Sequence, residues 1–232
     1  MPDLIVNNKK FTYQIIRKNI GSIRLSLKSR TKILVTCSRL TPEFFIKKFI
    51  NSNADWIIKY SKKITITPKI TSIQTINILG NDYQLFINKT PRDNVIIFED
   101  DRKIFLNTSN LSELHLKTVL EKRMKRLSLI LIKNEMKNIQ EDHPFKYRTI
   151  TVRNQKTRFG SCSSTGSLNF NWQIIFFPPD KFRHILFHEL VHLKVKNHSK
   201  VFWQTLAVYD PDWQTNNLWL KKEGTKCFII KP

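Results

Sequence analysis

The chain has 232 residues, 41% of them hydrophobic, including 16 Phe and 5 Trp, so it can form a packed core and is not an intrinsically disordered protein. Its length allows one large domain or two small ones. Its 40 Lys and Arg residues against 18 Asp and Glu give a formal charge of +22, which favours anionic partners such as nucleic acid or acidic surfaces. The basic residues are spread along the whole chain, as they also are on an ordinary lysine-rich solvated surface.

The cysteines and the N-terminal residues bear on the cellular compartment. Cys37, Cys162 and Cys227 are odd in number and form no C-x-x-C pair, which fits a reducing compartment and argues against a disulfide framework. The first ten residues lack the apolar core of a signal peptide. No apolar run approaches the roughly 18 residues that span a bilayer. We therefore expect a soluble, cytoplasmic protein without a membrane partner.

The first third of the chain predicts short strands followed by a helix. Residues 12–17, 22–28 and 32–37 are rich in β-branched residues, and Gly21 marks a turn. Thr41-Pro42-Glu43 has the pattern of a helix start, with Thr as N-cap and Pro at the first helical position. The apolar face of this helix continues to about residue 62.

The next section predicts two hairpins and a long helix. Strands at 76–79 and 83–88 flank Gly80-Asn81-Asp82, and strands at 95–98 and 103–106 flank a charged turn at 99–102. A helix capped by Ser109 or Asn110 extends to about residue 140, since apolar residues recur there at helical spacing, and Pro144 stops it.

Strand character returns at residues 147–153 and 167–177, which predicts a hairpin leading into a final helical region. Asp180 is the expected N-cap of a helix from 181 to about 196. Asn197 is the expected left-handed C-cap, and Ser199 should cap the next helix.

An H-E-x-x-H motif lies on this predicted helix. His188 and His192 are four residues apart, so both rings can point at one ion, and Glu189 lies beside them. Catalytic zinc takes three protein ligands and keeps one position for water, which makes His198 the natural third ligand. His184 is one turn upstream and is interpreted as a packing residue or as support for the ligands. The motif therefore predicts a single Zn²⁺ ion.

Zinc changes what Glu189 can do as a base. Bulk water ionises near pKa 15.7 and zinc-bound water near 7, a difference of roughly 12 kcal/mol at about 1.36 kcal/mol per unit. Glu189 is therefore the expected catalytic residue, which takes the water proton and passes it to the leaving amine. The sequence does not identify further oxyanion donors; Arg158 and Tyr209 are the candidates considered for substrate binding.

The spacing from His192 to His198 matches that of metzincins, but two of their features are missing. Val195 stands where metzincins have glycine, and every methionine of the chain lies upstream of the motif, so that there is no methionine turn. The metzincin assignment is therefore excluded.

Three segments together resemble the YgjP-like metallopeptidase family, which is related to the SprT and WSS1 metallopeptidases. The segments are KTRFGSCS at 156–163, HELVHL at 188–193 and NHSKVFW at 197–203. The similarity extends over nearly the whole chain, although Phe159 replaces a tryptophan that is common in the family. The resemblance implies a zincin-like fold, zinc on His188, His192 and His198, and Glu189 as catalytic acid and base.

The expected fold is therefore α+β. A β-rich N-terminal lobe with one helix, residues 1–108, precedes a zincin-like metallopeptidase lobe, residues 109–232, which carries the H-E-x-x-H helix. The expected function is zinc-dependent hydrolysis of peptide bonds in a protein or peptide substrate. Two alternatives stay open: a zinc hydrolase of a non-peptide amide or ester, and a basic nucleic-acid-binding protein with a structural zinc.

Overall fold

The computed structural model describes residues 3–6, 9–63, 69–155 and 158–230. Contacts between residues divide the chain into two compact units, Met1–Ile66 and Thr67–Pro232. Each unit has its own cluster of buried hydrophobic side chains. None of the described helices is both long and apolar enough to cross a bilayer.

The first unit is a four-stranded sheet with two helices. Its strands are β1 Asp3–Val6, β2 Lys9–Lys18, β3 Arg24–Ser29 and β4 Lys32–Ser38, in the order β1-β2-β4-β3. Alternate residues of β2 and β4 face one side, as the period of a strand requires, and pack with the helices α1 Glu43–Ser52 and α2 Ala54–Lys63. The fully buried side chains of this core include Tyr13, Ile33, Val35, Ile46, Ile50 and Ile57.

The helical pattern from residue 41 to 62 is two helices, not the single one expected. Asn53 separates them with φ −106° and ψ 20°, and its Nδ2 donates to the Phe49 carbonyl 2.8 Å away. An Asn side chain competes with the helical hydrogen bonds for such a carbonyl, which explains the break. The N-cap is Pro42 and not Thr41.

The second unit begins with a sheet made from the two predicted hairpins. Its strands are β5 Thr75–Ile78, β6 Asn81–Lys89, β7 Asn94–Phe98 and β8 Lys103–Thr108. Both hairpins are confirmed as antiparallel pairs. At the β5–β6 turn Leu79 and Gly80 both have positive φ, 46° and 84°, which is the conformation that two-residue turns use to match strand twist.

The two four-stranded sheets repeat one topology. The order β5-β6-β8-β7 matches β1-β2-β4-β3, and in each sheet the two central strands are parallel while both outer strands are antiparallel to their neighbours. Glu43 and Glu113, the first residues of α1 and α3, are 70 residues apart, as are Arg24 and Asn94, which begin β3 and β7.

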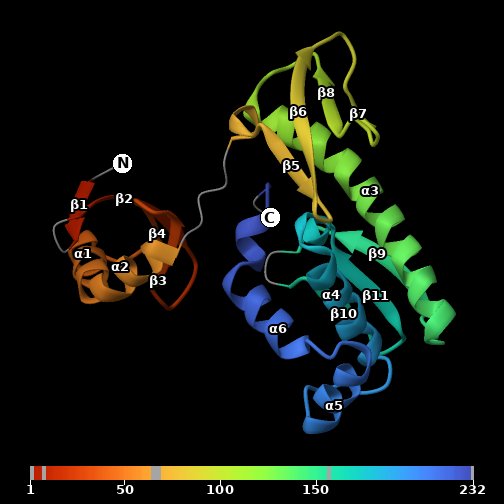
Figure 1. Cartoon of the computed structure of the whole chain (residues 1–232). Helices are drawn as coiled ribbons and strands as arrows, with labels where there is room; N and C mark the ends of the chain where they lie inside the picture. The colour runs from red at the N-terminus through yellow and green to blue at the C-terminus, as the bar shows by residue number, and fades with distance from the viewer. Residues whose placement is uncertain (1–2, 7–8, 64–68, 156–157, 231–232) are drawn as a thin grey trace. The chain divides into compact units, whose positions relative to one another are not determined.

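The helix α3, Glu113–Asp142, connects the two sheets of the second unit (Figure 1). It contacts β7 and β8 on one side, and β9 and the 3₁₀ segment η2, Trp172–Phe176, on the other. Its N-cap is Ser112, not Ser109 or Asn110; the Asn110 Oδ1 accepts instead from the Ser112 N–H at 2.8 Å. His143 follows the helix as its C-cap, directly before Pro144.

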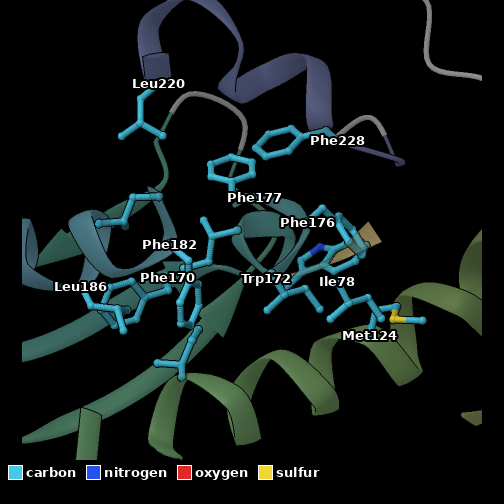
Figure 2. Close-up of a cluster of buried hydrophobic side chains, with 14 of the residues drawn as sticks. Ile78, Met124, Phe170, Trp172, Phe176, Phe177, Phe182, Leu186, Leu220 and Phe228 are labelled. Atoms are coloured by element: carbon cyan, nitrogen blue, oxygen red, sulfur yellow. The ribbon is translucent and has the colours of Figure 1, made fainter. Parts of the chain in front are cut away.

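The β5–β8 sheet shares its core with the H-E-x-x-H region. The Leu79 N–H donates to the Ile175 carbonyl at 2.8 Å, and Gly80 lies close enough to Pro179 that an added Cβ would stand 3.4 Å from its ring. Figure 2 shows Ile78 and Met124 in one cluster with aromatic side chains of the C-terminal half. The chain therefore divides after residue 66, and the expected boundary between residues 108 and 109 lies within a continuous core.

The remaining elements carry the motif. The strands β9 Thr149–Arg153, β10 Gly160–Cys162 and β11 Ser167–Asn171 form a sheet in the order β10-β11-β9. The expected strand 167–177 is wrong in its second half, which is the 3₁₀ segment η2. Asn171 causes the change, since its side chain accepts from the Gln173 N–H at 3.0 Å and caps that segment. Helices α4 Pro179–Val191, α5 Lys200–Tyr209 and α6 Trp213–Lys222 and the 3₁₀ segment η3 Gly224–Cys227 follow.

Candidate metal centre

The helix α4 starts earlier and ends earlier than the sequence predicted. Pro178 is its N-cap and Pro179 its first residue, a position where the missing N–H of proline costs nothing. Asp180, the expected N-cap, lies in the first turn, where its carboxylate still faces the positive end of the helix. The helix buries Leu186 and Leu190 in the core of the second unit. This packing fixes the face that carries the motif.

His188, His192 and His198 converge on one point. Each ring offers one nitrogen to a common point, and these three nitrogens all lie within 4.8 Å of one another. The Nε2 atoms of His188 and His198 are 3.0 Å apart. Tetrahedral zinc with bonds of about 2.0–2.1 Å separates its ligand nitrogens by about 3.3 Å. The spacing of the three rings therefore fits a single zinc-sized ion.

His198 reaches the other two rings through a short turn after α4. His192 is the C-cap, and the Lys194 and Val195 N–H groups both donate to the Val191 carbonyl at 2.9 Å. The expected left-handed cap at Asn197 is wrong, because the only described non-glycine residues with positive φ are Leu79 and Arg102. The turn closes through main-chain hydrogen bonds instead. Ser199 is confirmed as the N-cap of α5.

Aromatic side chains of α5 hold the three imidazoles. The buried Phe202 ring lies 4.9, 4.6 and 4.7 Å, centroid to centroid, from His188, His192 and His198. Trp203 stacks on His198 at 5.6 Å, and its indole N–H donates to the His198 carbonyl at 3.1 Å. The first residues of α5 thus orient His198, although the turn that carries it is exposed.

The protonation of these rings suits a metal. Burial, followed by the neighbouring histidines, lowers the pKa of His188 to about 3, and burial lowers the pKa of His192. The Val195 carbonyl is 3.0 Å from the His192 Nδ1 and accepts a hydrogen bond from its N–H, so the Nε2 lone pair is left free. Neutral imidazoles are the form that binds metal.

Glu189 is buried beside the three rings with no partner for one of its oxygens. Its side chain is 5% exposed, and Oε2 has no hydrogen bond to any described residue. Burial raises its pKa to about 8, while the Arg158 guanidinium acts in the opposite direction. An unpaired buried oxygen of this kind costs free energy unless a ligand or ion uses it. The donor set and this oxygen together fit a bound Zn²⁺.

Gly160 provides the space for Glu189. A Cβ on Gly160 would stand 2.7 Å from both Cγ and Oε1 of Glu189, closer than non-bonded atoms approach. Gly160 belongs to the segment KTRFGSCS at 156–163, and its residue type alone predicts no role for it. The residue is needed because the backbone of β10 passes directly over the carboxylate.

The free edge of β10 faces the cleft. Phe159 and Ser163 bond to β11, through Asn171 N to Phe159 O at 2.8 Å and Ser163 N to Ser167 O at 2.9 Å. Since antiparallel partners alternate, the N–H and C=O groups of Gly160 and Cys162 point away from β11. β10 is also the outer strand of its sheet. These groups are available to a further extended strand.

A cleft of about 540 Å³ joins these features. Helix α6 contributes Asn217, Leu220 and Lys221 to the lining of the cleft. Arg158 lines the cleft, whereas Tyr209 is not among its described lining residues. The Tyr209 ring packs instead against Phe145 and Phe187, at 5.0 and 5.8 Å. Lys156 and Thr157, which begin the segment quoted above, lie outside the described residues.

His184 lines the same cleft and anchors a buried polar network. Its Nδ1 donates to the Asp210 carboxylate at 2.5 Å, and the Asn216 amide donates to both oxygens of Asp210 at 3.0 and 3.1 Å. Lys181 completes the chain by donating to the Asn216 Oδ1 at 2.6 Å. The network ties α6 to α4, so the cleft residues of α6 are fixed to the motif helix. His184 lies outside the convergent histidine cluster.

The model of the family described as "YgjP-like, metallopeptidase domain" matches residues 21–223, which is most of the chain. No curated protein matches. Among solved structures, the chain is similar to the crystal structure of the metallopeptidase zymogen of Methanocaldococcus jannaschii jannalysin. The identity is 22% and the TM-score 0.31, over 44% of this chain and 94% of that one.

Proposed function

Because the chain belongs to the YgjP-like metallopeptidase family, we propose that it is a zinc peptidase that cleaves protein or peptide backbones. The observation that carries the proposal is the buried, unpaired Oε2 of Glu189 next to three convergent imidazoles. His188, His192 and His198 would hold the ion. When bound there, zinc supplies Lewis-acid activation of water and of the scissile carbonyl.

Glu189 moves the proton. Its unpaired oxygen accepts the proton of the attacking water and later donates it to the departing amine. Burial of the Glu189 carboxyl raises its pKa, whereas the positive charge of Arg158 favours the carboxylate form. Both protonation states are therefore accessible near neutral pH, as an acid and base catalyst requires.

The edge of β10 binds the substrate backbone. An extended peptide can exchange main-chain hydrogen bonds with Gly160 and Cys162, which lie in the wall above Glu189. Main-chain pairing is independent of the substrate sequence and brings a peptide group to the carboxylate. This feature favours a peptide over a small amide or ester.

The test compares wild type with Glu189→Gln. The substitution keeps the size of the side chain and removes the base, so hydrolysis of casein and of an unstructured peptide should fall by at least about 100-fold. The zinc content, measured on the purified proteins, should stay near one ion per chain. Glu141→Gln, at an exposed position of α3, is the matched control and should retain full activity.

Two results would contradict the proposal: full activity of Glu189→Gln, or zinc-loaded wild type that hydrolyses small amides or esters and no peptide. Nucleic-acid binding stays a prediction from the net charge of +22 and from the analogy with related families.

A further inference from the structure

The cleft carries an excess of positive charge. Arg158, Lys196 and Lys221 line it, all three with exposed side chains. The only carboxylate among the described lining residues is Glu189, which is buried at the floor. A charged substrate side chain in this cleft therefore meets three cations.

These cations form no ion pair with any acidic residue that the structure describes. Their positive charge is therefore not neutralised by any acidic side chain that the structure describes.

The cations stand at both ends of the substrate-binding edge. Arg158 precedes Gly160 by two residues. We assign Lys221 to the same end, because it lies three residues before Gly224, where an added Cβ would stand 2.6 Å from Cζ of Phe159. Lys196 is at the other end, where its Nζ lies 3.5 Å from the Ser163 carbonyl. From residue 158 to 163 an extended chain covers at most about 16 Å, the length of about five residues of a paired strand.

We propose that the cleft selects extended peptide segments with Asp or Glu on both sides of the scissile bond, within about two residues of it, through Arg158 and Lys221 at one end and Lys196 at the other. The inference rests on the proposed peptidase function and names its substrate class. An acidic side chain of the peptide paired with a cation at each end would also fix the register of the peptide on β10. The main-chain hydrogen bonds by themselves allow the peptide to slide along the strand.

Quenched-fluorescence peptides of one length and one central dipeptide test the preference with zinc-loaded wild type. The flanking positions carry Glu, Gln or Lys, and a fourth peptide carries the same number of Glu residues at its termini. We expect kcat/KM to be several-fold, and up to about 25-fold, higher for flanking Glu than for flanking Gln, since each exposed charge pair contributes up to about fivefold and a Glu on each side makes two pairs. The fourth peptide has the same net charge and should behave like the Gln peptide.

Substitution of the cleft cations by uncharged Gln identifies the residues that cause the preference. Lys196→Gln and the pair Arg158→Gln with Lys221→Gln should each remove part of the preference, and the triple variant should cleave the flanking-Glu and flanking-Gln peptides with equal kcat/KM. Lys133→Gln, at an exposed position of α3, removes one charge away from the cleft and should change nothing. The preference should also fall as ionic strength rises from about 0.1 M to about 1 M, where the Debye length shortens from about 10 to 3 Å.

Fluorescence anisotropy with Glu189→Gln measures binding of the same peptides without turnover. Equal rates and equal binding for the flanking-Glu and flanking-Gln peptides, or an undiminished preference in the triple variant, would overturn the inference and leave the peptidase function standing. Hydrolysis of none of the peptides would count against the peptidase function instead, and the binding comparison would still decide the charge preference.

Discussion

At the scale of single residues, the site depends on how closely the backbone of β10 approaches Glu189 as much as on the three histidines. Glu189 is confined between its helix and the backbone of β10, and only glycine leaves room at position 160. Phe202 contacts the rings of all three histidines and so positions them. The position of Glu189, the proposed general base, is thus set by a residue that carries no side chain.

Gly160→Ala should reduce kcat/KM for peptides by at least about tenfold, because Glu189 must move to relieve a 2.7 Å contact and a displacement near 1 Å can cost about 100-fold. The zinc content should stay unchanged, since no histidine is touched. The control is Gly21→Ala, where an added Cβ meets nothing within 4 Å. Unaltered kinetics of Gly160→Ala would show that Glu189 need not hold this position.

Asp93 provides a pH-dependent contribution to stability. Its Oδ1 accepts from the Thr108 hydroxyl at 2.8 Å and the Ser109 N–H at 3.1 Å, and its Oδ2 lies 2.7 Å from the His115 Nε2. These hydrogen bonds, that of Thr108 first, lower the pKa of Asp93 below its ordinary value. A carboxyl with a lowered folded-state pKa stabilises the fold above its unfolded pKa of about 3.9, and this contribution is lost as the pH falls through the folded value.

Asp93→Asn should therefore lower the thermal unfolding temperature at pH 7, and the difference from wild type should shrink as the pH falls below about 4. Thermal unfolding followed by circular dichroism between pH 7 and pH 3 measures it. Asp101→Asn is the comparison, because its carboxylate is exposed and lies 3.7 Å from the Lys103 Nζ. If the difference in unfolding temperature between Asp93→Asn and wild type stays constant over this pH range, the Asp93 carboxylate does not make this pH-dependent contribution.

At the scale of elements, the predictions that succeeded depend on local patterns. The hairpins β5–β6 and β7–β8, the position of α3 and the N-cap Ser199 follow from alternation, helical spacing and short-range capping. The predictions that failed concern where an element starts or stops. Asn53 ends α1 and Asn171 turns a strand into a 3₁₀ segment, each by a side-chain hydrogen bond to the backbone that competes with the regular structure.

At the scale of the whole molecule, the chain consists of two units with separate cores. They contain four-stranded sheets of the same topology, yet only the second sheet shares its core with the motif helix. Its tip contacts that helix at Pro179. The second unit is therefore the smallest part of the chain expected to hold the complete site.

A fragment of residues 67–232 should fold, bind about one zinc ion and unfold thermally at the same temperature as the corresponding transition of the full chain, because every residue of the cleft and its core lies within it. Calorimetry and zinc analysis of the fragment and the full chain check this. A fragment of residues 109–232 lacks the β5–β8 sheet and serves as the comparison, which should fail to fold. If the shorter fragment is as stable as the longer one, the sheet is not part of this core.

The sequence by itself predicted the chemistry that we propose for this protein. Spacing of four residues on a helix brings His188 and His192 together, and the residue types indicate zinc and a base, because both predictions depend only on local geometry and on side-chain chemistry. Tertiary structure decided what depends on contacts between distant segments: the glycine over Glu189, the His184–Asp210 network, the charged ends of the cleft and the division of the chain after residue 66. Such contacts join residues that are far apart in the chain, and no local pattern records them.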